Sequence, residues 1–333
     1  MRAVVLVGGF GTRLRPLTHH RPKQMLPIVN RPMIEHVVGH LANYGVDDVV
    51  LSLGYRPDAF SAAYPDGRCA GATLQYAIEP EPLDTAGAIR FAALDAGIDE
   101  RFLVLNGDVL TDLDIGAFLA FHESRGAEAT IALHRVDDPS RYGVVPTDGE
   151  GRVVQFVEKP PRGEAPTDLI NAGTYVFEPA VVDRIPAGRR VSVERETFPA
   201  LVADRSLYAL DDGCYWIDTG TPCEYVQAQI DLVDGVRGAP VEGVHQSADV
   251  SADASVKRAV VGARAVIAAG ARVEAAVLLA GAGVEADAVV DGSVIGERAV
   301  VGAGAHVTGG SVVGDGHVVG RGERLDGVRV PGG

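Results

Sequence analysis

A glycine-rich segment near the N-terminus is the first place where residue types and spacing suggest chemistry. Residues 8–16 read Gly-Gly-Phe-Gly-Thr-Arg-Leu-Arg-Pro and come directly after an apolar run. A glycine-rich turn that follows a strand exposes successive backbone N–H groups, which can bind phosphate oxygens. The dinucleotide fingerprint is excluded because Leu14 stands where that motif needs glycine, and a Walker loop is excluded because the chain has no Gly-Lys pair. Arg13 and, ten residues later, Lys23 therefore predict a phosphate site of another kind.

Lysine is rare in this chain, and two of its lysines are therefore candidates for binding phosphate. Only three of the 30 basic side chains are lysines, namely Lys23, Lys159 and Lys257. In such a chain a lysine indicates a site that favours a compact ammonium over the planar fork of arginine. Lys23 lies in the phosphate segment and Lys159 at the end of a predicted strand, whereas Lys257 is expected at the surface. The alternative for all three is a solvated face.

Two aspartates follow apolar runs. Asp108 stands in Leu-Asn-Gly-Asp-Val at residues 105–109, and Asp218 stands in Trp-Ile-Asp-Thr-Gly at residues 216–220. In open α/β sheets, ligands bind at the carboxyl ends of the strands. Two carboxylates at that edge could hold a Mg²⁺ that substrate phosphates also bind. Each aspartate could instead cap a turn.

The elements that must position these groups alternate between strand-like and helix-like patterns up to about residue 240. Residues 32–44 predict a helix, since proline stands in the first turn and Ile34, Val37 and Leu41 share one face. Such alternation predicts an α/β sandwich with a largely parallel sheet. The predicted strands are residues 3–7, 49–53, 73–78, 102–105, 129–136, 153–158 and 174–177.

After residue 250 the sequence repeats in steps of six, occasionally five, residues. An aliphatic residue at each step is usually followed by a small or acidic one. Three steps make one turn of a triangular coil, and each turn can bury its apolar face only against the next. The spacing resembles the hexapeptide repeat of left-handed parallel β-helices. We predict domains at residues 1–238 and 245–333, with a linker around residues 240–247.

Composition and charge exclude some classes of binding partner. The net charge is −15, which argues against nucleic acid or a membrane surface as a partner. The three cysteines, Cys69, Cys214 and Cys223, form no C-x-x-C pair and are odd in number. This pattern favours free thiols in a reducing compartment. No apolar run approaches the ~18 residues that a membrane span needs, so we expect a cytoplasmic protein.

Four further motifs establish a resemblance to a known family. They read Pro-Leu-Asp-Thr-Ala-Gly at residues 82–87, Tyr-Gly-Val-Val at 142–145, Val-Glu-Lys-Pro at 157–160 and Ile-Asn-Ala-Gly at 170–173. With the glycine-rich segment and the two aspartate motifs, they occur in the order found in sugar-1-phosphate nucleotidylyltransferases. The chain most resembles mannose-1-phosphate guanylyltransferases that carry a C-terminal β-helix. The resemblance implies a Rossmann-like, GT-A-like α/β/α sandwich with a mixed sheet, followed by the left-handed β-helix.

The resemblance implies distinct roles for five charged residues. Arg13 would steady the leaving pyrophosphate, Lys23 would bind the NTP phosphates, and Lys159 would hold the sugar phosphate. Asp108 and Asp218 would ligate Mg²⁺ at the α-phosphate. The attacking group is a phosphate oxygen with a second pKa near ~6, so it is mostly ionised at neutral pH and needs no general base. Catalysis would then consist of in-line positioning and charge neutralisation.

The resemblance also implies sets of binding residues. Glu158 and Asn171 would contact sugar hydroxyls. The other sugar-phosphate residues would be Lys159, Tyr142, Gly143, Gly173 and Trp216. The nucleotide would be bound by Val7, Gly8, Gly9, Gly11, Thr12, Arg13, Lys23, Gln24, Glu79, Pro82, Thr85, Ala86, Gly87, Asn106, Gly107 and Asp108. The expected partners are an NTP and a sugar 1-phosphate, and we expect a homo-oligomer formed through the β-helix.

The choice of base depends on three positions. Glu79 stands where thymidylyl and uridylyl relatives typically have glutamine, and a carboxylate suits the adjacent N–H donors of guanine. Asp108 followed by Val109 also resembles the guanylyl branch, whereas Lys23 followed by Gln24 resembles the thymidylyl branch. We therefore expect GTP with mannose 1-phosphate. The alternatives are dTTP or UTP with glucose 1-phosphate, and another sugar 1-phosphate such as a heptose.

A few residues keep other classes of function open. Asp84 occupies a position where relatives usually have glycine, which leaves a non-catalytic sugar-nucleotide-binding regulator as an alternative. His306 and His317 in the repeats could serve a CoA-dependent acyltransferase, although no long loop that would cover CoA is evident. His36 and His40 have the spacing of zinc ligands on a helix but lack an evident third ligand.

Overall fold

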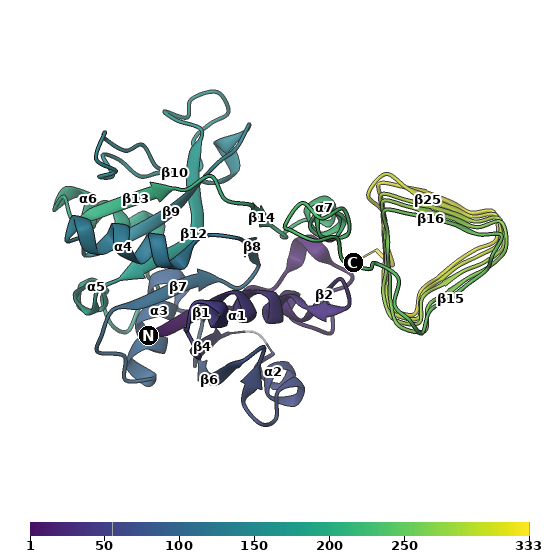
Figure 1. The fold of residues 1–333 in the computed structure, drawn as a ribbon, viewed down its shortest axis with the longest axis horizontal. Helices are drawn as coiled ribbons and strands as arrows, with labels where there is room; N and C mark the ends of the chain where they lie inside the picture. Colours follow the sequence, from purple (N-terminus) through teal and green to yellow (C-terminus); the bar gives the residue numbers. More distant parts are fainter. Residues whose placement is uncertain (55, 333) are drawn as a thin grey trace. The chain divides into compact units, whose positions relative to one another are not determined.

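The computed structural model describes residues 1–54 and 56–332 in two compact bodies (Figure 1). The sheet body comprises Met1–Gly9 and Ile34–Trp216, and the coil body comprises Phe10–Met33 and Ile217–Gly333. Each body has its own hydrophobic core.

The sheet body is built on a mixed ten-stranded β-sheet. Its centre is parallel, because β1 (Arg2–Leu6) pairs with β4 (Asp48–Leu53) on one side and with β7 (Phe102–Asn106) on the other. β12 (Leu169–Phe177) then runs antiparallel to both β7 and β9 (Ala129–Arg135). The predicted mixed sheet is thereby confirmed. The other strands of this sheet are β5 (Arg68–Cys69), β6 (Ala72–Ile78), β10 (Gly143–Val144), β11 (Val157–Glu158) and β13 (Leu207–Asp211). A separate two-stranded sheet pairs β8 (Val109–Thr111) with β14 (Trp216–Asp218).

Both faces of the central strands are buried, as an α/β sandwich requires. Val4, Val50 and Val104 are at most 1% exposed and pack in one cluster with Ile89 of a covering helix. Val5 points to the opposite face and is equally buried. The helices are α1 (Met33–Asn43), α2 (Pro57–Ala63), α3 (Asp84–Asp95), α4 (Ile115–Arg125), α5 (Pro179–Arg184) and α6 (Phe198–Ala203), with short helical turns at Pro139–Arg141 and Val193–Thr197.

The strand predicted over residues 153–158 differs from the structure. Only Val157–Glu158 forms a strand, and Val153 makes an isolated antiparallel bridge with Thr147. The hydrogen bond from Val154 N–H to the carbonyl of Pro146 belongs to that isolated bridge, and residues 154–156 form no strand. The predicted strand is therefore longer than the one that the backbone hydrogen bonds form. The helix predicted over residues 32–44 is confirmed as α1.

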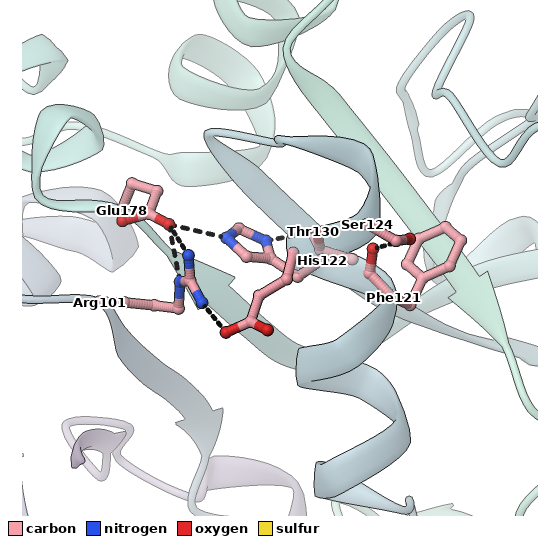
Figure 2. A network of polar contacts seen from close by, with 7 residues as sticks. Arg101, Phe121, His122, Ser124, Thr130 and Glu178 are labelled. Atoms are coloured by element: carbon pink, nitrogen blue, oxygen red, sulfur yellow. Dashed lines mark hydrogen bonds and ion pairs between the residues drawn. The ribbon is translucent and has the colours of Figure 1, made fainter.

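A buried polar network ties α4 to β9 in the sheet body (Figure 2). Nε2 of His122 lies 3.2 Å from the Glu178 carboxylate, and Nδ1 lies 2.7 Å from the hydroxyl of Thr130. Arg101 donates to the same carboxylate. Burial lowers the pKa of His122. Because a carboxylate only accepts, neutral His122 donates through Nε2 and accepts from Thr130 through Nδ1.

The coil body contains three parallel sheets of five strands each, stacked as turns of a triangular coil (Figure 1). The aliphatic residue at each corner points inward, so that Val261, Leu278 and Ile295 of one sheet are completely buried. The predicted left-handed β-helix is thereby confirmed. Its first sheet is β15 (Asp249–Val250), β18 (Val266–Ile267), β21 (Gly283–Val284), β24 (Val300–Val301) and β27 (Val318–Val319).

The other two sheets repeat this register. The second is β16 (Ser255–Lys257), β19 (Arg272–Glu274), β22 (Val289–Asp291), β25 (His306–Thr308) and β28 (Arg324–Asp326). The third is β17 (Val260–Val261), β20 (Val277–Leu278), β23 (Val294–Ile295), β26 (Val312–Val313) and β29 (Arg329–Val330).

The N-terminal part of the coil body is a folded segment, Phe10–Met33, that packs with α7 (Pro222–Val233). The hydroxyl of Tyr225 donates to the carbonyl of Pro27 at 2.5 Å, and Val29 N–H donates to Oε1 of Gln229. The segment includes the helical turns Thr12–Leu14 and Lys23–Met25 and the hairpin strands β2 (Pro27–Ile28) and β3 (Arg31–Pro32). Across residues 1–54 and 56–332, none of the helices combines the length and hydrophobicity of a membrane span.

Candidate active site

Three parallel strands of the sheet body, β7, β1 and β6, end at the same edge of the sheet, with β4 between β1 and β6, and bring predicted site residues to that edge. Val7 and Gly8 follow β1, Glu79 follows β6, and Gly107 follows β7. A Cβ at Gly8 would lie 3.6 Å from Oε1 of Glu79, and a Cβ at Gly107 would lie only 2.6 Å from Cγ1 of Val7. Gly107 therefore has no room for a side chain, which explains the glycine in the Asn-Gly-Asp motif.

Glu79 is held by the protein as well as placed at the strand edge. Its Oε1 accepts from the hydroxyl of Ser52 at 3.3 Å, and its Oε2 accepts from the backbone N–H of Leu83 at 3.0 Å. Each carboxylate oxygen has a second lone pair with which it can accept from a ligand. The sequence did not indicate that Glu79 also anchors the loop that follows it.

That loop leads into α3, whose first residue has an unusual backbone conformation. Asp84 has φ +63°, in the left-handed region that favours glycine. Oδ1 of Asp84 accepts from Thr85 N–H at 2.8 Å, which is the local bond that makes aspartate tolerable there. Ala86 and Gly87 both donate their N–H groups to the carbonyl of Val191. These two predicted nucleotide-binding residues therefore use their amides to fix the start of α3.

A bulge in β12 lets another strand end approach it closely. The register with β9 shifts between Asn171 and Tyr175, and Gly173 has φ +74°. A Cβ at Gly173 would lie 2.5 Å from Nδ2 of Asn106. Oδ1 of Asn171 accepts from Gly173 N–H, and its Nδ2 donates to the hydroxyl of Tyr175. The bulge thus gathers the predicted residues Asn106, Asn171 and Gly173.

The predicted sugar-phosphate residues form a second group in the sheet body. Nζ of Lys159 lies 3.1 Å from Oε1 of Glu158, and Lys159 N–H donates to the carbonyl of Tyr142. Lys159 has φ +48°, a conformation that costs a non-glycine residue energy and tends to occur at functional sites. Gly143 pairs with Glu158 across two antiparallel strands. The geometry brings together four of the residues that the sequence singled out.

Trp216 joins this group through ring contacts. Its indole Nε1 donates to the carbonyl of Ala172 at 2.8 Å, and its ring meets Tyr142 edge-on with centroids 5.7 Å apart. His134 stacks on the indole at 5.1 Å. Burial lowers the pKa of His134, so the ring is neutral at neutral pH. Sequence reasoning missed His134, because it stands inside a predicted strand with no motif around it.

The coil body contains Arg13, Lys23 and Asp218 of the predicted site. Nη2 of Arg13 lies 3.8 Å from Oδ2 of Asp218, and a Cβ at Gly220 would collide with the Arg13 guanidinium. Gly11 has φ +61°, and a Cβ there would lie 3.2 Å from Cβ of Lys23. Glycine at position 220 leaves room for the Arg13 guanidinium, and glycine at position 11 leaves room for the Lys23 side chain.

Gln24 is buried next to Lys23. Its side chain is 3% exposed, and within the described residues its Oε1 has no hydrogen-bond partner. A buried acceptor without a donor is costly. Thr12 and Arg13, by contrast, are exposed.

The donor chemistry of the two aspartates suits a hard cation. Asp108 follows β7 in the sheet body, and Asp218 ends β14 with a side chain that is 18% exposed. Carboxylate oxygens are preferred Mg²⁺ ligands, and two are enough when substrate phosphates and water complete the shell. Among residues 1–54 and 56–332, His, Cys, Asp and Glu side chains form no group of three or more that could hold a metal by themselves.

The zinc and acyltransferase alternatives find no support in the geometry. Nε2 of His40 lies 3.0 Å from the carbonyl of Leu113, which is a structural contact. His306 lies in β25 and His317 just before β27, and the coil runs through both without a long insertion. The two histidines are therefore part of a regular β-helix turn.

A Rossmann-like sheet whose strand ends gather the predicted site residues, followed by a β-helix, is the architecture expected of a nucleotidyltransferase. Comparisons with known proteins identify the family. A model of the nucleotidyl transferase family matches residues 2–235, and a model of the GMPPB C-terminal domain matches residues 240–330. The chain belongs to the nucleotidyl transferase family. It is an enzyme of that class, and the family is typically metal-dependent.

Individual relatives agree with this membership. A mannose-1-phosphate guanylyltransferase of Mycobacterium tuberculosis is 46% identical over 289 residues, which cover 84% of this chain and 80% of that protein. A mannose-1-phosphate guanyltransferase of Hypocrea jecorina is 43% identical over 232 residues, which cover 68% of this chain and 62% of that protein. The structure of HddC from Yersinia pseudotuberculosis complexed with GMP-PN has 31% identity and a TM-score of 0.58, over 68% of this chain and 97% of that chain.

Proposed function

We propose that the protein transfers GMP from GTP to mannose 1-phosphate, giving GDP-mannose and pyrophosphate. The observation that carries the proposal is the 46% identity, over 84% of the chain, to a protein named mannose-1-phosphate guanylyltransferase. Glu79 supports guanine as the base, because its carboxylate is held at the strand edge and keeps accepting capacity for the N1–H and amino group.

In the proposed reaction a phosphate oxygen of the sugar attacks the α-phosphorus in line. The new P–O bond forms as the bond to the leaving pyrophosphate breaks, so no proton has to be removed from an already ionised nucleophile. Arg13 steadies the pyrophosphate, Lys23 binds the NTP phosphates, and Lys159 binds the sugar phosphate. Positioning and charge neutralisation supply the rate enhancement.

We propose Mg²⁺ as the metal and Asp108 and Asp218 as the residues that would hold it. When bound, the metal would neutralise charge on the α-phosphate and the leaving group. Nη2 of Arg13 lies 3.8 Å from Oδ2 of Asp218, and this ion pair helps to orient the carboxylate.

The remaining assignments are part of the same proposal. Glu158 and Asn171 contact sugar hydroxyls, beside Tyr142, Gly143, Gly173 and Trp216. The nucleotide contacts Val7, Gly8, Gly9, Gly11, Thr12, Gln24, Glu79, Pro82, Thr85, Ala86, Gly87, Asn106 and Gly107. We further propose residues 1–238 as the catalytic domain, residues 245–333 as the β-helix domain, and a homo-oligomer formed through the latter. The cytoplasmic location expected from the cysteine content remains a prediction.

One observation favours a second nucleotide. Gln24 follows Lys23 as in the thymidylyl branch. The second candidate is therefore dTTP or UTP with glucose 1-phosphate.

Product analysis tests the proposed function. The protein is incubated with GTP, mannose 1-phosphate and Mg²⁺, and the nucleotides are separated by anion-exchange chromatography. We expect GDP-mannose and pyrophosphate in equal amounts. Hydrolysis of GTP without a sugar nucleotide, or conversion of dTTP and glucose 1-phosphate alone, would overturn the proposal.

A further inference from the structure

The segment that carries Arg13 and Lys23 is organised by short-range hydrogen bonds. Leu14 N–H donates to Gly11, Met25 N–H donates to Pro22, and the hydroxyl of Thr18 donates to the carbonyl of Gly11 at 2.8 Å. These bonds shape individual turns but fix no turn relative to the rest of the body. The segment contains only two short hairpin strands and no α-helix before Met33, so its position must come from contacts made elsewhere in the chain.

One such contact joins the segment to the β-helix through a double ion pair. Nη1 of Arg21 lies 2.5 Å from Oε1 of Glu297, and Nη2 lies 2.8 Å from Oδ2 of Asp315. The two carboxylates stand 276 and 294 residues away along the chain. The Arg21 side chain is 20% exposed, and those of Glu297 and Asp315 are 31% and 26% exposed. The pair is therefore partly shielded from water and is screened less than a surface ion pair.

The two acids are rigid because successive β-helix turns approach very closely where they stand. Glu297 N–H donates to Oδ1 of Asp315 at 2.8 Å, so one carboxylate is fixed to the turn that carries the other. A Cβ at Gly296 would lie 2.6 Å from the backbone nitrogen of Asp315. At Gly314, a Cβ would lie 2.8 Å from Cγ of Pro16. The same β-helix corner thus receives both Arg21 and the ring of Pro16.

Electrostatics at this corner are consistent with a firm contact. Burial alone would lower the pKa of Arg21, but the hydrogen bonds and charges of Glu297 and Asp315 together raise it. The hydrogen bond from Arg21 in turn lowers the pKa of Glu297. Arg21 lies two residues before Lys23 and eight after Arg13, with the Pro22 turn between Arg21 and Lys23.

We propose that Arg21, Glu297 and Asp315 form a clamp through which the β-helix positions the phosphate-binding segment and so sets the affinity for the NTP. The proposal rests on the proposed function for the roles of Arg13 and Lys23. The clamp residues are positioning residues, because Arg21 acts through the backbone that it shares with Lys23. The β-helix then contributes to nucleotide binding by positioning this segment.

The test compares Arg21→Gln with a matched control in the full-length protein. The control is Arg258→Gln, since Arg258 makes an ion pair at 2.6 Å with Asp234, next to α7 in the same body but away from the segment. Three readouts are taken: the Kd for GTP and for dTTP with Mg²⁺, KM for each substrate and kcat, and hydrogen exchange of peptides within residues 10–33.

We expect Arg21→Gln to weaken NTP binding by on the order of tenfold, because a remote change that shifts reacting groups by about 1 Å can lower the rate by roughly 100-fold, and a shift of the binding groups should weaken binding in the same direction. KM for the sugar 1-phosphate should stay within about twofold and exchange in residues 10–33 should rise. The double variant Glu297→Gln/Asp315→Asn should reproduce all three effects, Arg21→Lys should partly rescue them, and Arg258→Gln should leave them unchanged.

The proposal is overturned if Arg21→Gln keeps the wild-type NTP affinity and the wild-type hydrogen exchange in residues 10–33. It is overturned as well if Arg21→Gln raises KM for the NTP and KM for the sugar 1-phosphate equally. It is also overturned if Arg258→Gln has the same effects. If Arg21→Gln does not fold, the double variant gives the same comparison. Nucleotide affinity and exchange do not depend on which sugar is used, so a wild-type protein that binds NTP but makes no GDP-mannose would refute the proposed function and leave the clamp test decisive.

Discussion

The substitution Glu79→Gln tests how the base is selected. This substitution should leave the local structure unchanged, because glutamine can keep both intramolecular hydrogen bonds of Glu79. Its Oε1 can still accept from Leu83 N–H, and its Nε2 can donate to the hydroxyl of Ser52. The loop that leads into α3 should therefore keep its position. What changes is the ability to accept from two adjacent donors on guanine.

The size of the effect follows from that loss. A carboxylate can accept from both N1–H and the amino group of guanine, whereas an amide accepts with one oxygen and turns a donor toward the other group. A hydrogen bond to a charged group contributes about 1.5–3 kcal/mol. Losing one should lower kcat/KM for GTP by roughly 10- to 150-fold. For dTTP and UTP the amide is no worse, so their kcat/KM should stay level or rise.

The assay measures kcat/KM for GTP and dTTP with one sugar 1-phosphate in wild type, Glu79→Gln and Glu81→Gln. Glu81 is an exposed carboxylate two residues further along the same loop, so it controls for the loss of one negative charge. Melting temperatures of all three proteins should agree closely. An unaltered ratio of GTP to dTTP in Glu79→Gln, or the same shift in Glu81→Gln, would refute the reasoning.

Three further predictions concern the metal, the backbone and a buried histidine. Asp218→Asn should lower turnover by orders of magnitude with the fold intact, and unchanged turnover at limiting Mg²⁺ would remove Asp218 from the metal site. Asp84→Ala should destabilise the protein by about 1–2 kcal/mol in urea titrations, because alanine lacks the local hydrogen bond that offsets a left-handed φ; Asp84→Gly should cost less than half as much, and equal losses would contradict the assignment. His122 has a lowered pKa in the folded state, so its contribution to stability is present above its unfolded pKa and is lost as pH falls. The free energy of unfolding should fall between pH 7 and 5, and in His122→Asn it should fall less steeply; identical pH profiles would exclude His122 as the source.

Much of the architecture could be predicted because it is encoded in local patterns. Apolar runs such as residues 3–7 and 102–105 are buried on both faces only if they form central strands of a sheet. The hexapeptide spacing, in turn, predicts a coil whose turns stack on one another. The strand ends then place Gly8, Glu79 and Gly107 together, since parallel strands share one carboxyl edge. Asp84 was singled out from the sequence, and the structure places it at positive φ.

What the sequence could not indicate depends on contacts between distant residues. The strand over residues 153–158 is shorter than predicted, because Val153 bridges Thr147 whereas Val157–Glu158 pairs with β10. No spacing rule links Arg21 to Glu297, and nothing in the sequence marks His134 as the partner of Trp216. Nor could the sequence show that the N–H groups of Ala86 and Gly87 are used by Val191.

The most direct test of the account is pyrophosphate release measured across a matrix of substrates. GTP, dTTP, UTP, ATP and CTP are each combined with mannose, glucose and related sugar 1-phosphates in the presence of Mg²⁺. We predict that GTP with mannose 1-phosphate gives the dominant rate and that omission of the metal abolishes it. A dominant rate with another pair would contradict the assigned substrates, and silence in every combination, from folded protein that binds nucleotide, would contradict the proposed catalytic roles of Arg13, Lys23 and Asp218.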